Sequence, residues 1–91
     1  MSEPIRVLIT DDHFIVRQGL RLVLNTADDI ELVGEAVNGE EALQLTAEHQ
    51  PQVVLMDLRM PVMDGLTAIE QLQQKHPHVA VIILTTYNLS L

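Results

Sequence analysis

Val53-Val54-Leu55-Met56 is an uninterrupted apolar run, and Asp57 follows it at the start of a polar turn. A short run without polar alternation is typical of a strand whose two faces are both covered, as in a parallel sheet flanked by helices. In such sheets, functional groups lie just beyond the carboxyl ends of the strands. The run therefore predicts an α/β fold and makes Asp57 a candidate site residue.

Three further strands are expected around this run, because three other short apolar segments are bounded by turn residues: Ile5–Thr10, Ile30–Ala36 and Val79–Leu84. Segments with helical patterns separate the four strands. Strands that alternate with helices through short connections imply right-handed crossovers, a parallel sheet and helices on both of its faces.

The first of these helices is predicted by apolar residues at helical spacing. We expect Phe14 and the following stripe to lie in the core: Val16, Gly19, Leu20, Val23 and Leu24.

The second and third helices have recognisable start signals. Asn38 with Glu41 three residues later forms a capping-box pattern, and Asp64 can cap the third helix. We expect the second helix to end at Gln50-Pro51 and the third at His76-Pro77. The residues expected to face inward are Ala42, Leu43, Leu45 or Thr46, and Ala47 in the second helix, and Ala68, Ile69 and Leu72 in the third.

Composition excludes several classes of protein. The 91 residues suffice for one domain, 1–91, and the net charge of −8 repels the phosphates of nucleic acids, so direct binding of DNA or RNA is not expected. The absence of cysteine fits a reducing compartment. Neither a signal peptide nor an apolar run long enough to cross a bilayer is visible, so we expect a cytoplasmic protein without membrane contact.

Polar residues follow three of the predicted strands. Asp11 and Asp12 come after the first strand, Asp57 after the third and Thr85 after the fourth. Converging carboxylates repel one another by about 1 kcal/mol per pair at ~4 Å in water, and more in a partly desolvated site, so a divalent cation would stabilise them. Oxygen ligands in an open site favour Mg²⁺ over Ca²⁺. A carboxylate beside Mg²⁺ can also attack phosphorus, and this chemistry would centre on Asp57.

Structural roles compete with this interpretation. Aspartate is common at helix starts and turns, which suffices to explain Asp12 or Asp64 alone but not the whole acidic set. Thr85 can satisfy its own backbone at a strand end. The four histidines show no ligand spacing around the predicted crevice, so surface or turn positions are expected for His13, His49, His76 and His78.

Taken together, these pieces resemble the receiver domain of response regulators, most closely the NarL and FixJ group, and they cover nearly the whole chain. The matching segments are Val7–His13, Gly34–Ala36 with Asn38–Ala42, Val54–Pro61, Met63–Gly65 and Ile82–Thr85. The resemblance implies a three-layer αβα, flavodoxin-like fold with a parallel sheet in the order 2-1-3-4, lacking the last helix-strand-helix.

The resemblance also implies a function. A sensor histidine kinase would transfer a phosphoryl group to Asp57, as a step in the regulation of transcription by a longer parent protein. Mg²⁺ would be held by Asp11, Asp12, Asp57 and the backbone carbonyl of Arg59. The hydroxyl of Thr85 would bond the phosphoryl group.

The sequence departs from the family's pattern at its C-terminal end, where a helix, a fifth strand and a final helix are expected. The family's lysine at the end of the fifth strand has no counterpart, because Lys75 is the only lysine and lies about 15 Å from the site along the third helix. We therefore expect impaired phosphorylation or switching. Val79–Leu84 would be an exposed edge strand, which predicts self-association through this strand into a homo-oligomer.

Two other functions compete with this interpretation. A Mg²⁺-dependent phosphohydrolase would usually carry Asp-x-Asp after the strand, and Asp57-Leu58-Arg59 lacks the second aspartate. A truncated receiver that binds a kinase or a second copy without completing the switch is the more serious alternative. We therefore expect a protein that is not itself an enzyme.

Overall fold

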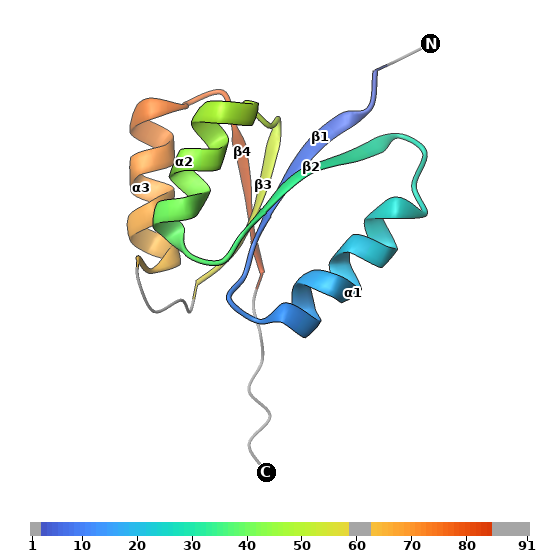
Figure 1. Cartoon of the computed structure of the whole chain (residues 1–91). Helices are drawn as coiled ribbons and strands as arrows, with labels where there is room; N and C mark the ends of the chain where they lie inside the picture. The colour runs from blue at the N-terminus through green and yellow to red at the C-terminus, as the bar shows by residue number, and fades with distance from the viewer. Residues whose placement is uncertain (1–2, 59–62, 85–91) are drawn as a thin grey trace.

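Strands and helices alternate along the whole of this computed structural model (Figure 1), which describes residues 3–58 and 63–84. In chain order the elements are β1 (Ile5–Thr10), α1 (Phe14–Asn25), β2 (Ile30–Ala36), α2 (Gly39–His49), β3 (Val53–Asp57), α3 (Gly65–Lys75) and β4 (Ala80–Leu84). Every predicted element is present. The last strand begins one residue later than predicted, because the backbone N–H of Val79 donates to the carbonyl of His76 in the preceding turn.

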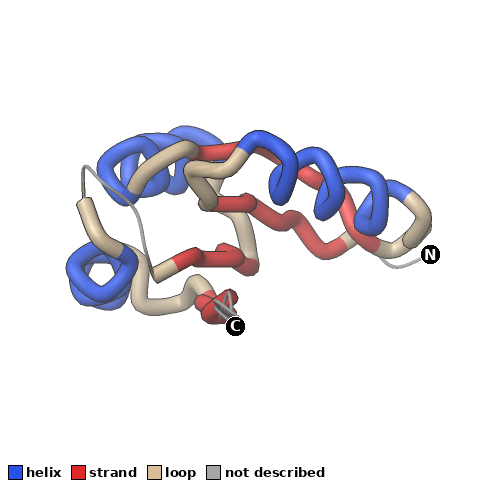
Figure 2. Tube along the Cα trace, turned by 90° about the horizontal axis from the view of Figure 1, so that it is seen from below, coloured by secondary structure: helices blue, strands red, loops and turns tan. Residues whose placement is uncertain are grey.

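The strands form one parallel sheet in the order β2-β1-β3-β4, as the family resemblance implied. Helix α1 lies on one side of the sheet, and α2 and α3 lie on the other, so the fold has three layers (Figures 1 and 2). The central strands β1 and β3 pair from Val7–Val53 to Thr10–Met56. This register brings the residues that follow Thr10 next to Asp57, the last residue of β3.

The main hydrophobic core lies between the sheet and the α2–α3 layer. Alternate residues of the central strands, Leu8, Val54 and Met56, are fully buried there. Ala68 and Leu72 of α3 pack against them, as predicted. Leu8 and Met56 are among the largest fully buried side chains, so this core is aliphatic.

The opposite side of the sheet is covered less completely, which corrects one prediction. Helix α1 contributes no fully buried side chain, although it packs on β1 and β2. Phe14 and Val23 were expected in the core, but they are 58% and 66% exposed. Gly19 is also exposed, whereas Val16, Leu20 and Leu24 are half-buried.

Two arginines explain why α1 is turned in this way. Arg21 bonds the carboxylate of Glu35 on β2, with Nη2 at 2.6 Å and Nε at 2.7 Å, and Arg17 Nε lies 3.4 Å from the same carboxylate. Both arginines must therefore face the sheet. Val23 lies about 120° or more from both arginines around the helix, at 100° per residue, so this orientation directs it to solvent. The Arg17 guanidinium also lies over the ring of Phe14, 5.7 Å from its centre.

Helix α2 begins where the sequence indicated. The side chain of Asn38 accepts a hydrogen bond from the backbone N–H of Glu41 at 2.8 Å. The carboxylate of Glu41 accepts in return from the N–H of Val37, one residue before the position that a standard capping box uses. Ala42 and Thr46 are buried, but Ala47, which was expected to face inward, is exposed because the buried stripe follows the Ala42–Thr46 line.

Strand β4 lies at an edge of the sheet, where it pairs with β3 among the residues that the structure describes. Its side chains Ile82 and Ile83 are 52% and 47% exposed, although alternate residues of a strand point to opposite faces. The predicted exposed apolar strand is thus confirmed for the described part of the chain. Within that part, no helix has the length and apolar character needed to cross a bilayer.

Candidate metal centre

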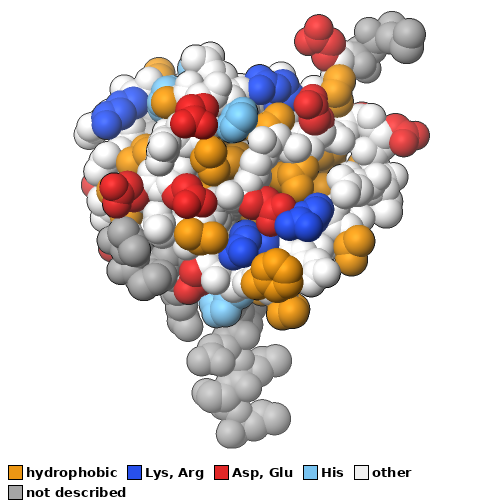
Figure 3. Space-filling model, in the orientation of Figure 1, with side chains coloured by type: hydrophobic (Ala, Val, Ile, Leu, Met, Phe, Trp, Pro, Cys, Tyr) orange, Lys and Arg blue, Asp and Glu red, His pale blue; other side chains and the backbone are white. Residues whose placement is uncertain are grey.

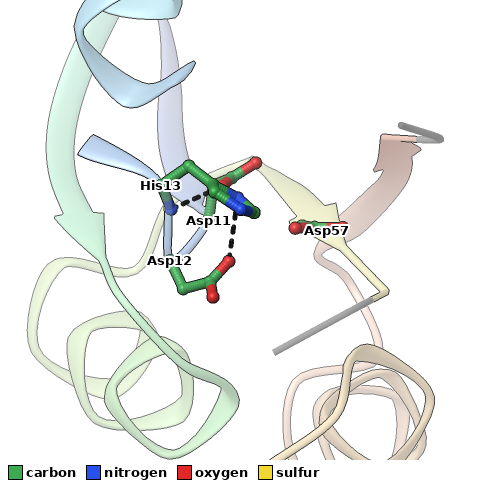
Figure 4. Close-up of side chains that lie close together, drawn as sticks. All are labelled: Asp11, Asp12, His13 and Asp57. Carbon is green, nitrogen blue, oxygen red and sulfur yellow. Dashed lines mark hydrogen bonds and ion pairs between the residues drawn. The ribbon is translucent and has the colours of Figure 1, made fainter. Parts of the chain in front are cut away.

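Three carboxylates and one imidazole meet at the carboxyl ends of β1 and β3 (Figure 4). Asp11 and Asp12 follow β1 directly, and Asp57 is the last residue of β3. One potential ligand atom from each of these residues and from His13 can be chosen so that all four lie within 4.8 Å of one another. The structure therefore brings together the three aspartates that the sequence predicted.

Burial distinguishes the members of this cluster. The side chains of Asp11 and Asp57 are almost fully buried, whereas Asp12 is more accessible. Asp11 is fixed by its backbone, since its N–H donates to the carbonyl of Ala36 at 3.0 Å and its carbonyl accepts from Arg17 Nη1 at 2.9 Å. A carboxylate this deep in the protein is costly unless its charge is compensated.

The hydrogen bonding of the Asp11 carboxylate indicates whether these residues suit a cation. Its Oδ1 accepts a hydrogen bond from the backbone N–H of His13 at 2.8 Å, but its buried Oδ2 has no hydrogen-bond partner among the described residues. A buried carboxylate oxygen without a hydrogen-bond partner, next to two further carboxylates, suits a positively charged ligand. The oxygen donors are those that Mg²⁺ prefers. The residues present therefore fit a divalent cation.

His13 lies at the surface and in a turn, as predicted, but it also belongs to the acidic cluster, which was not predicted. Its side chain is 61% exposed, and its Nδ1 lies 3.0 Å from Asp11 Oδ1 and 3.1 Å from Asp12 Oδ1. The hydrogen bond with Asp11, together with the charge of Asp12, raises the pKa of His13 above its ordinary value. The available signal was its position directly after the acidic pair, in the turn that begins α1.

Gly65 and Asp64 fix the start of α3 next to the end of β3. Gly65 begins α3, and its N–H donates to the carbonyl of Leu58 at 3.2 Å. Asp64 caps α3 as predicted, since its Oδ1 accepts from the N–H of Thr67 at 2.7 Å. This hydrogen bond holds the pKa of Asp64 below its ordinary value. The N–H of Gly39 donates to the carbonyl of Met63 and so connects α2 to the start of α3.

Two predicted site residues, Arg59 and Thr85, lie outside the described residues. Lys75 is in the last turn of α3, at the end of the helix that is distant from Asp57. The described part of the site thus contains carboxylates, an imidazole and the positively polarised start of α1. A buried carboxylate beside a cation site can act as a nucleophile toward an electrophilic phosphorus.

Comparison with known proteins identifies the family. The model of the response regulator receiver domain family matches residues 7–90, which is most of the chain. The chain belongs to this family. Its receiver domain is similar to the transcriptional regulatory protein YdfI of Bacillus subtilis, with 52% identity over 83 residues that make up 91% of the chain and 38% of YdfI.

Solved structures agree with this assignment. The receiver domain of the response regulator NarL from Mycobacterium tuberculosis superimposes with a TM-score of 0.89 at 33% identity, covering 96% of this chain and 70% of that one. The isolated receiver domain of RcsB from Salmonella enterica, solved with a beryllium fluoride phosphomimetic, gives a TM-score of 0.86 at 30% identity, covering 94% and 64%. The chain spans about two fifths of the length of the curated relatives it matches. The names of these relatives describe regulators of transcription rather than enzymes.

Proposed function

We propose that this receiver domain accepts a phosphoryl group on Asp57 from the phosphohistidine of a sensor histidine kinase. The observation that carries the proposal is the buried Asp11 carboxylate, whose Oδ2 lacks a hydrogen-bond partner among the described residues and which belongs to the same cluster as Asp57. Membership in the receiver family supports the same chemistry, as does the similar RcsB receiver, which was solved in the presence of a phosphomimetic.

In this proposal Mg²⁺ would be held by Asp11, Asp12, Asp57 and the backbone carbonyl of Arg59. When bound, Mg²⁺ would compensate the charge of the carboxylates and of the incoming phosphoryl oxygens. A carboxylate oxygen of Asp57 forms the new bond to phosphorus while the bond between phosphorus and the kinase histidine nitrogen breaks. The bonding electron pair stays with the imidazole, which takes up a proton. Thr85 would then donate its hydroxyl to the phosphoryl group.

The proposal extends to the protein that carries this domain. Because the related regulators are more than twice as long as the matched region, we propose that the domain controls a separate output unit in a regulator of transcription, of the NarL and FixJ type. We place the exchange with the kinase in the cytoplasm. We also propose that copies of the domain associate with one another, as the exposed β4 indicates.

The test uses the chain with Mg²⁺ and a small-molecule phosphodonor, followed by intact-mass spectrometry. We expect one added phosphoryl group in the wild type and none in Asp57→Asn. Asp64→Asn is the matched control, since Asp64 is an exposed aspartate outside the acidic cluster, and it should be phosphorylated like the wild type.

Two results would contradict the proposal that Asp57 accepts the phosphoryl group. Modification that persists in Asp57→Asn would show that another residue accepts the group. Mg²⁺ binding without any phosphorylation would favour the second function considered above, a module that binds a kinase or a second copy without completing the switch.

A further inference from the structure

His13 is the one member of the cluster that the proposed function leaves without a role. Its Nδ1, and not only its backbone, is directed at the carboxylates of Asp11 and Asp12 (Figure 4). An imidazole nitrogen is a poor ligand for Mg²⁺, which prefers oxygen, but it is a good ligand for the later first-row transition ions.

The distances between these atoms suit metal coordination. Ligand atoms at about 2.1 Å from a metal are about 3.0 Å apart when they occupy neighbouring octahedral positions and about 3.4 Å apart in a tetrahedral site. His13 Nδ1 lies 3.0 Å from Asp11 Oδ1 and 3.1 Å from Asp12 Oδ1. The nitrogen therefore already lies at the spacing of a neighbouring ligand.

A second observation points to a cation at this position. The side chain of Asp11 is fully buried, and its Oδ2 has no hydrogen-bond partner among the described residues. His13 satisfies only Oδ1, through its backbone N–H and its ring. The histidine alone therefore leaves one oxygen of the buried carboxylate without a partner among the described residues, which suits a positively charged ligand.

We propose that His13 Nδ1 is a metal ligand that turns the site into a mixed nitrogen and oxygen site, which binds ions such as Co²⁺ or Zn²⁺ in preference to Mg²⁺. The inference rests on the proposed function, because the same aspartates hold both kinds of ion. In this site one side chain, that of His13, sets how strongly transition ions compete with Mg²⁺ for the proposed phosphoacceptor.

The helix that follows His13 makes this idea testable without unfolding the protein. His13 is the N-cap of α1, but its side chain makes no capping hydrogen bond. Replacing it by alanine therefore removes the imidazole without removing a cap. His49 is a suitable control, because it is a partly exposed histidine whose Nε2 lies 3.9 Å from the Glu48 carboxylate in α2.

The experiment compares Co²⁺ and Mg²⁺ binding by calorimetry in chains without a polyhistidine tag. We expect the wild type to bind Co²⁺ at least about tenfold more tightly than Mg²⁺. His13→Ala should lose about tenfold or more in Co²⁺ affinity while its Mg²⁺ affinity changes less than about twofold, and His49→Ala should match the wild type for both ions. In nitrogen NMR, Zn²⁺ should shift the Nδ1 resonance of His13 far more than its Nε2 resonance.

Three results would overturn the inference: Co²⁺ affinity that is unchanged in His13→Ala, equal losses for Co²⁺ and Mg²⁺, or a Zn²⁺ shift at Nε2 instead of Nδ1. Failure of the proposed function is detected separately, as absent Mg²⁺ binding or absent phosphorylation of Asp57 in the wild type. Intact Mg²⁺ binding and phosphorylation with Co²⁺ affinity independent of His13 would remove this inference alone.

Discussion

Gly65 lies directly against the backbone of Asp57, the proposed phosphoacceptor. A Cβ atom at Gly65 would be 2.5 Å from the carbonyl oxygen of Asp57 and 2.6 Å from the Cα of Leu58, both of which are backbone atoms. We therefore expect Gly65→Ala to displace the end of β3, to lower the free energy of unfolding by about 1–3 kcal/mol and to slow phosphorylation. Urea unfolding and intact-mass kinetics would measure the two effects.

Gly19→Ala is the matched control for this substitution. Apart from the chain neighbours of Gly19 and the backbone of its own helix, nothing lies within 4 Å of a Cβ atom at Gly19, which is in the interior of α1. Alanine should therefore raise the free energy of unfolding by about 0.5–1 kcal/mol and leave phosphorylation unchanged. A Gly65→Ala protein as stable and as readily phosphorylated as the wild type would contradict the close approach at Asp57.

The residues of the site were largely predictable from the sequence, for a simple geometric reason. Carboxyl ends of parallel strands meet at one edge, so Asp11 and Asp57 had to converge once their strands were recognised. His13 was not found because a histidine in a turn is identified as a ligand only when the ring direction is known. That direction depends on the backbone between Asp11 and Phe14, which the residue pattern does not specify.

At the scale of elements, the start of α3 makes stability depend on pH. Asp64 has a folded pKa below its ordinary value of 3.8, because its carboxylate accepts the backbone hydrogen bond of Thr67. The stabilisation is therefore fully present above the unfolded pKa and is lost as the pH falls through the folded value. Asp64→Asn retains a capping oxygen but does not titrate.

The corresponding measurement is urea unfolding of the wild type and Asp64→Asn at neutral and acid pH. We expect the wild type to be the more stable of the two near pH 7 and its advantage to shrink below about pH 4. An advantage that is constant with pH would show that the carboxylate charge does not contribute to the cap.

Element boundaries followed from the sequence, but the orientation of elements followed only in part. Strands and caps are local, so Asn38 and Asp64 could be recognised as helix starts without knowledge of the rest of the fold. The prediction that Val23 of α1 is buried was wrong. Periodicity shows which residues share a face of the helix, but it does not show that Arg17 and Arg21 pair with Glu35 on the neighbouring strand. An ion pair with a neighbouring strand cannot be predicted from the residue pattern of one helix alone.

At the scale of the whole molecule, the exposed apolar edge at β4 predicts self-association. Ile82 and Ile83 are about half exposed on a strand that pairs with β3 among the described residues. We expect light scattering after gel filtration to show dimers at high concentration, and Ile82→Lys to return the protein to monomers, because lysine on an edge strand discourages pairing.

Leu22→Lys tests whether self-association depends on β4 or on exposed apolar side chains in general. Leu22 is 65% exposed on α1, away from β4, so its replacement should leave dimers intact. Figure 3 shows further hydrophobic side chains over α1, which makes the control necessary. Monomers in the wild type at every concentration, or dimers lost only in Leu22→Lys, would contradict association through β4.

The order of the strands could not be obtained from periodicity alone. Alternating patterns fix the number and direction of strands but allow several arrangements, and the order 2-1-3-4 came from the resemblance to a family. The sheet β2-β1-β3-β4 confirms that order. The order of the strands was therefore predictable only through the resemblance to the family.

The uneven burial on the two sides of the sheet has a consequence for motion. Since α1 has no fully buried side chain, its separation from the sheet exposes less apolar surface than opening of the α2–α3 core. Amide hydrogens of α1 should therefore exchange with solvent earlier than those of β1 and β3. Because Asp11, Asp12 and His13 connect β1 to this helix, such partial opening would loosen one wall of the site while Asp57 stays fixed in the sheet.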